Sequence, residues 1–237
     1  MNIEEKSVIL IQRIFRGYLC RRDRLPTFLY VIQKYLSNYN IKFSNIEDDG
    51  RINSCIDETE IILILLNEFN IRIKKPLSRC WYDILINDYL YGWLPVNIKS
   101  TTTKTNDNSG NLTMCVYSYT NYNLDINTDK SYTNGEMSKI LVKKLKNKEY
   151  NYINKRDYYF IVVNKQTNEI IINSLKGLSL LTPNINNLPF QICWSKNKDY
   201  KYNKIDDVIN KFILCIKKSK PSWRDIFINE MRNMTIT

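Results

Sequence analysis

The 237-residue sequence contains no histidine, and this absence removes several classes of active site. Without imidazole there is no Ser-His-Asp or Cys-His nucleophile system, no histidine-dependent metal nuclease and no zinc site with a histidine ligand. Glycine is also scarce, and no two of its six copies lie close enough to form a GxGxxG or GxxxxGK loop. The sequence therefore excludes the glycine-rich loops that cradle nucleotide phosphates.

The chain also lacks cysteine pairs and long apolar runs. Its six cysteines are widely spaced and form no CxxC motif, so we expect free thiols in a reducing compartment and no structural zinc. No segment approaches the roughly 18 apolar residues of a membrane span, and the N-terminus has no signal-peptide pattern. The sequence predicts an intracellular protein that does not cross a membrane.

Positive charge is the main surplus. Lys and Arg number 35 against 24 Asp and Glu, which gives a formal charge of +11, and 43% of the residues are hydrophobic. The hydrophobic content is enough for a sizeable core. The charge indicates a polyanion or an anionic membrane surface as partner. A soluble basic protein whose lysines follow AT-rich coding is the alternative.

Periodicity predicts a mixed α/β fold, in which helices flank a central β-sheet. We expect one domain over residues 27–237, preceded by a basic helical arm at 1–26. Ser54 is the expected N-cap of the third helix, and residues 87–94 are the expected turn of a hairpin. The predicted helices are 7–24, 27–35, 55–69, 112–119, 136–148, 206–217 and 221–231, and the predicted strands are 81–86, 95–102, 158–163 and 169–174. For residues 112–119 a strand is the alternative.

Polar residues converge on the predicted hairpin. If its turn is centred near Leu90, Asp83 lies opposite Asn97, because each is seven residues from the centre. Strand alternation then places Lys99 on the same face as Asn97. A carboxylate and an amide oxygen can hold a hard divalent cation such as Mg²⁺, and a lysine beside them can orient the water that the cation polarises. Hydrolysis of a phosphodiester needs these groups and no histidine.

From Gly50 to Trp194 the sequence resembles the PD-(D/E)XK nuclease superfamily, and most closely its type II restriction endonuclease branch. The resemblance is carried by DGRINSCIDE at the start of a helix, WYDILI, PVNIKSTT and the later strands YYFIVV and EIIINS. It implies that Asp83 binds the metal, that Lys99 is the catalytic lysine and that Glu58 is an acid supplied by the preceding helix. The implied protein is a Mg²⁺-dependent endonuclease on double-stranded DNA, working as a homodimer and leaving 5′-phosphate ends.

Asn97 departs from the family pattern, which has Asp or Glu at this position. An amide oxygen can ligate a metal but carries no charge, so cation affinity should fall unless Glu58 supplies the missing charge. The alternative is a catalytically inactive nucleic-acid-binding or calmodulin-binding protein on a nuclease fold. A basic structural protein that serves packaging is a third possibility.

Several polar and basic residues are candidates for DNA contact. Hydroxyl and ammonium groups follow Lys99 and can reach phosphate oxygens. A basic helix has three lysines on one face, which can follow a phosphate backbone or simply be solvated. The predicted DNA-contact residues are Arg51, Asn53, Ser100, Thr101, Thr102, Lys104, Lys139, Lys143 and Lys146.

The segment IQRIFRGYLCR resembles the IQ motif. The five positions of its pattern are filled by Ile11, Gln12, Arg16, Gly17 and Arg21. The resemblance implies that calmodulin or another EF-hand protein binds this basic amphipathic helix. The alternative is a helix docked on its own domain, with its arginines in solvent or on DNA. A calmodulin partner implies the cytoplasm or nucleus of a eukaryotic host, and the composition suits a large DNA virus, in whose virion the protein is packaged.

Overall fold

The chain folds around a five-stranded mixed sheet with a second, smaller sheet beside it. The computed structural model describes residues 12, 17, 24–44, 50–77, 80–126, 131–184, 189–219 and 225–234. In the large sheet the order is β1-β2-β3-β5-β6, and in the small sheet it is β4-β8-β7. The strands are β1 (Ile73–Lys74), β2 (Ile84–Asp88), β3 (Gly92–Thr101), β4 (Asn106–Asp107), β5 (Tyr159–Asn164), β6 (Ile170–Ser174), β7 (Thr182–Pro183) and β8 (Phe190–Cys193). The predicted mixed α/β class is confirmed.

Two antiparallel hairpins are joined side by side through a parallel pair. β2 and β3 form the first hairpin, and its turn needs Gly92, whose φ of 69° lies in the left-handed region. β5 and β6 form the second hairpin, as predicted. β3 runs parallel to β5, so the chain between them must cross over, and this crossover carries β4 and two helices.

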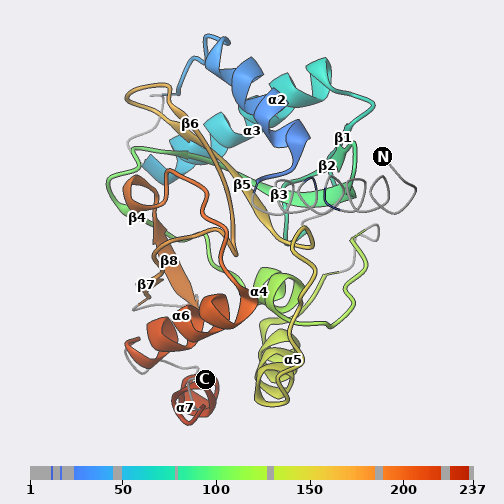
Figure 1. The fold of residues 1–237 in the computed structure, drawn as a ribbon. Helices are drawn as coiled ribbons and strands as arrows, with labels where there is room; N and C mark the ends of the chain where they lie inside the picture. The colour runs from blue at the N-terminus through green and yellow to red at the C-terminus, as the bar shows by residue number, and fades with distance from the viewer. Residues whose placement is uncertain are drawn as a thin grey trace, which may run out of the picture.

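Helices cover both faces of the large sheet, as Figure 1 shows. α2 (Thr27–Ser37) and α3 (Gly50–Glu68) lie on one face, and α4 (Leu112–Tyr119), α5 (Asn134–Lys146) and α6 (Ile205–Lys217) lie on the other side. α7 (Asp225–Arg232) packs against α5 and α6. The strands alternate between two hydrophobic cores. In β5, Ile161 and Val163 join the core with α2 and α3, and Phe160 and Val162 join the other core.

The boundaries differ from the predicted ones at several places. α3 begins at Gly50 and not at Cys55, and the predicted cap Ser54 lies inside the helix, where its Oγ donates to the Gly50 carbonyl at 2.8 Å. β2 begins three residues later than predicted, at Ile84. The last helix begins, among the described residues, at Asp225. The predicted helix at 7–24 lies almost wholly outside the described residues, of which Gln12 and Gly17 are helical.

Candidate functional site

The first hairpin has the predicted register. The ladder between β2 and β3 ends at the pair Ile84–Val96, so Asp83 and Asn97 are the next positions outward. The Asp83 amide donates to the Val96 carbonyl at 3.0 Å and extends the pairing by one bond. The Asp83 carboxylate is held by the Ile98 amide, which donates to Oδ2 at 2.8 Å. Asp83 is therefore fixed beside Asn97 at the point where the hairpin opens.

Glu58 reaches this end of the hairpin from α3. The Lys99 ammonium lies 3.2 Å from Glu58 Oε1 and 3.4 Å from Oε2, and the Ser100 amide donates to Oε1 at 3.3 Å. The two side chains are mostly buried, with exposed fractions of 21% for Lys99 and 18% for Glu58. The structure thus brings together the four residues that the sequence proposed as catalytic: Glu58, Asp83, Asn97 and Lys99.

Burial and mutual proximity shift the pKa values of the ionisable groups. Burial raises the pKa of Glu58 above its ordinary value, although Lys99 and the Ser100 amide act in the opposite direction. Burial also raises the pKa of Asp83, against the effect of the Ile98 amide. Burial alone would lower the pKa of Lys99, but the nearby carboxylates outweigh it and the pKa is raised. Lys99 is therefore an ammonium at neutral pH.

The ligand types around Asp83 fit a hard divalent cation. The carboxylates of Asp83 and Glu58 and the amide oxygen of Asn97 are the oxygen donors that Mg²⁺ prefers. Asn97 Oδ1 is buried and has no hydrogen-bond donor in the described part of the chain, which leaves it available as a ligand. No three His, Cys, Asp or Glu side chains within the described ranges are grouped closely enough to hold a metal. The donor types suit a hard divalent cation, and such a cation would need the Asn97 oxygen because the described residues form no group of three charged ligands.

The predicted DNA-contact residues fall into three groups. Arg51 and Lys104 are exposed, and Thr101 and Thr102 are half-buried. Two others are buried and bonded within the protein. Asn53 accepts from the Ser44 hydroxyl at 3.2 Å, and the Ser100 hydroxyl donates to Asp57 at 3.3 Å.

The third group lies on α5. Lys139, Lys143 and Lys146 line a single cavity of about 600 Å³ between α5 and α7, which agrees with the prediction that they share one face. Lys146 forms an ion pair with Glu230 of α7. Figure 1 shows α5 and α3 at opposite ends of the molecule, so these lysines are remote from the helix that carries Glu58.

Two acidic residues near Lys99 were not foreseen. Asp57 is completely buried next to Glu58 and accepts from three groups, which include Lys165 at 2.6 Å. Asp107 of β4 acts on the Lys99 charge, and its carboxylate accepts from the buried Trp194 indole at 3.1 Å. Asp107 lies in the polar segment 103–110, which the sequence predicts to be a linker. The sequence could have pointed to Asp57 only through its position directly before the candidate acid Glu58.

The IQ positions are only partly described. Gln12 is helical and exposed, and Gly17 is helical and half-buried. Ile11, Arg16 and Arg21 lie outside the described residues. No helix within those residues is long and apolar enough to cross a bilayer.

Comparison with known proteins adds one family. The family model of the IQ calmodulin-binding motif matches residues 5–23. This match covers the arm alone and indicates calmodulin binding for it. No curated protein and no solved structure matches the chain.

Proposed function

We propose that the chain is a Mg²⁺-dependent endonuclease that hydrolyses phosphodiester bonds in double-stranded DNA. The observation that carries the proposal is the meeting of Glu58, from α3, with Lys99 beside Asp83 at the open end of the hairpin. Two carboxylates, an amide oxygen and an ammonium at one place can hold a cation and a phosphate together. The resemblance to type II restriction endonucleases supports the same activity.

Each residue has a role that its surroundings favour. Asp83 is oriented by the Ile98 amide and binds the cation, with Asn97 Oδ1 as the neutral second ligand. When bound, the cation lowers the pKa of a water and neutralises charge on the phosphate. Lys99 is protonated at neutral pH because acidic neighbours raise its pKa, so it orients the attacking water and stabilises negative charge and does not take up a proton.

The substrate follows from the charge. A net charge of +11 attracts a polyanion, and the exposed Arg51 and Lys104 are cations that can contact phosphates. An enzyme that cuts both strands of a short palindrome works as a two-fold dimer, so we propose a homodimer. By analogy with the family, the products carry 5′-phosphate and 3′-hydroxyl ends.

Digestion of a sequenced plasmid with Mg²⁺ tests this function. Wild type should give discrete fragments, and Asp83→Asn and Lys99→Met should reduce cleavage by about 10²-fold or more, the usual size of a lost electrostatic contribution. Lys198→Met removes a cation from an exposed pair and should cut like wild type. Absence of cleavage with both Mg²⁺ and Mn²⁺ would refute the enzyme and favour a binding protein on this fold.

We also propose that the arm recruits calmodulin or a similar EF-hand protein, because the IQ family model matches it. Titration of full-length protein with calmodulin, with and without Ca²⁺, should show binding that Gln12→Ala together with Arg16→Ala weakens. Lys34→Ala, in α2, removes a cation outside the motif and should bind like wild type. Equal binding by all three proteins would exclude the arm as the binding segment.

A further inference from the structure

Three elements meet at the buried carboxylate of Asp57. Asp57 Oδ1 accepts from the Ser44 amide at 2.7 Å, and Oδ2 accepts from Lys165 at 2.6 Å and from the Ser100 hydroxyl at 3.3 Å. Ser100 is near the end of β3, and Lys165 directly follows β5. The Lys165 amide also donates to the Thr101 carbonyl at 3.0 Å. Asp57 thus ties α3 to the ends of two adjacent strands.

This arrangement is energetically demanding. The Asp57 side chain has an exposed fraction of 0% and that of Lys165 is 19% exposed, so both charges lose most of their hydration. A buried ion pair is rarely more stable than well-packed apolar residues of the same size, whereas loss of one partner is strongly destabilising. Stability alone therefore does not account for a charged pair here.

The position of Asp57 suggests what the pair does. Asp57 directly precedes Glu58 in α3, and successive residues of a helix point about 100° apart. A fixed Asp57 consequently fixes the direction of Glu58. The contact between Glu58 and the Lys99–Ser100 segment depends on that direction, because all three bonds to Glu58 are 3.2 Å or longer and leave little margin for a rotated helix.

We propose that Asp57 and Lys165 are positioning residues, which hold α3 against the ends of β3 and β5 so that Glu58 stays on Lys99 and the Ser100 amide. The relevance of this contact for catalysis rests on the proposed nuclease function. The positioning itself does not, and it is measurable without metal or DNA.

Hydrogen exchange of the Ser100 amide in full-length protein is the test, since this amide donates to Glu58. The double variant Asp57→Asn with Lys165→Met removes both charges and leaves neither buried alone. We expect Ser100 to exchange about 10-fold faster or more, as for loss of a bond worth about 1.4 kcal/mol. The Val162 amide in the middle of the sheet is the reference, because global destabilisation would accelerate both amides alike.

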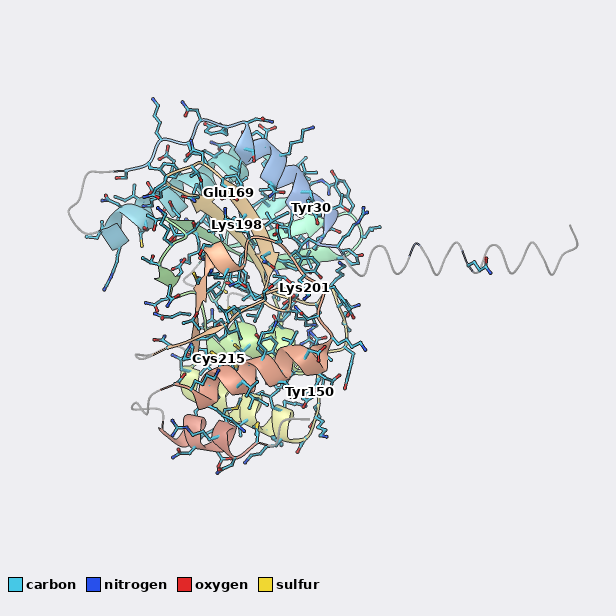
Figure 2. The ribbon with its side chains drawn as sticks, turned by 60° about the vertical axis from the view of Figure 1, so that its left-hand side comes forward. Tyr30, Tyr150, Glu169, Lys198, Lys201 and Cys215 are labelled. Carbon is cyan, nitrogen blue, oxygen red and sulfur yellow. The ribbon has the colours of Figure 1, made fainter. Side chains whose placement is uncertain are left out.

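Control variants separate positioning from a general loss of charge. Glu169 lies, like Lys165, in the turn between β5 and β6, and its carboxylate is 2.5 Å from the Lys198 ammonium. Figure 2 shows these two side chains near each other, and Glu169→Gln with Lys198→Met removes this ion pair. This control should leave the Ser100 amide unchanged, and Lys165→Arg should preserve it. Should the double variant not fold, Asp57→Asn with Lys165→Gln gives the same decision, because it also leaves no charge unpaired and keeps a side-chain oxygen that can accept from the Ser44 amide.

The outcomes are distinct. Faster exchange at Ser100 relative to Val162 supports the positioning role, and equal acceleration of both, or none, overturns it. An inactive wild-type protein with faster Ser100 exchange in the variant would refute the nuclease and leave the positioning role standing.

Discussion

Replacement of Lys99 by methionine perturbs the central ion pair and has a consequence that requires no activity. The substitution removes the ammonium beside the Glu58 carboxylate, which then keeps the Ser100 amide, at 3.3 Å, as its hydrogen-bond donor. Loss of one partner of a fully buried pair costs about 3–5 kcal/mol, and an exposure of about one-fifth admits enough water to reduce this to about 2–3 kcal/mol. A domain of this size loses roughly 2–4 °C per kcal/mol, so the unfolding temperature should fall by about 4–12 °C at neutral pH.

The destabilisation should depend on pH, with a sign that the structure fixes. Burial raises the pKa of Glu58, and Lys99→Met removes the main opposing influence, so this pKa rises further in the variant. A carboxyl with a raised folded pKa contributes most below its unfolded pKa and loses that contribution as the pH rises through the folded pKa. Lys99→Met should therefore approach wild-type stability in acidic buffer and fall behind it toward neutral pH.

Urea denaturation followed by tryptophan fluorescence, in acidic and in neutral buffer, measures both effects. The double variant Glu58→Gln with Lys99→Met should recover much of the loss, because no charge is left buried and unpaired. Lys198→Met, in a pair whose partners are 43% and 39% exposed, should cost less than about 1 kcal/mol. If Lys99→Met lowers the free energy of unfolding equally at both pH values, or by less than about 1 kcal/mol at neutral pH, Lys99 does not compensate a buried Glu58 charge.

Three further outcomes are expected. Mg²⁺ affinity, measured by calorimetry, should weaken on acidification, because protons compete with the cation for Asp83 and Glu58. Burial raises the pKa of both carboxyls, so the loss should begin at a higher pH than for ordinary carboxylates, and an affinity independent of pH would exclude both as ligands. Gly177→Ala should lower stability by about 1–3 kcal/mol in thermal unfolding, since its Cβ would lie 2.4 Å from Tyr200 Cδ2, whereas Gly135→Ala meets nothing within 4 Å and should be tolerated. DNA affinity should fall about 10³–10⁵-fold between about 50 and 200 mM salt if roughly 6–10 phosphates are contacted, and a flat response would mean that the +11 charge does not contact DNA.

The hairpin could be predicted from sequence because its determinants are local. Alternation along residues 81–86 and 95–102 fixed the faces, and Gly92 fixed the turn, so the register that sets Asp83 beside Asn97 followed by counting. The later hairpin was equally clear, since a polar turn separates two apolar runs. Helix 112–119 was also predicted correctly, and every residue of it is buried.

The start of α3 was misplaced for a physical reason. Ser54 followed by acidic residues has the composition of a helix N-terminus, but a serine can also donate to the carbonyl four residues earlier within a helix. Ser54 does this with Gly50. The composition of a first turn therefore did not distinguish a cap from a helix interior.

The contacts that sequence could not supply are those between distant segments. The strands of the small sheet have two to four residues, too few to show alternation. The pairing of Asp57 with Lys165 depends on how α3 lies across the ends of β3 and β5, and no spacing in the sequence encodes it. The four candidate catalytic residues were foreseen, and the groups that hold them in place were not.

The chain enters the domain at the opposite end of the first hairpin from the proposed catalytic residues. α2 begins where the Phe28 amide donates to Asp88 Oδ2 at 3.0 Å, and Asp88 also accepts from the Leu90 amide at 2.9 Å in the hairpin turn. Asp88 is at the far end of β2 from Asp83, about 16 Å away at roughly 3.3 Å per residue. Under the proposed function, the segment that would bind calmodulin therefore joins the domain at the closed end of the hairpin, and the DNA would bind at its open end. If both proposals hold, the arm would act as a tether, which raises the local concentration of the nuclease near its target and leaves the open end accessible.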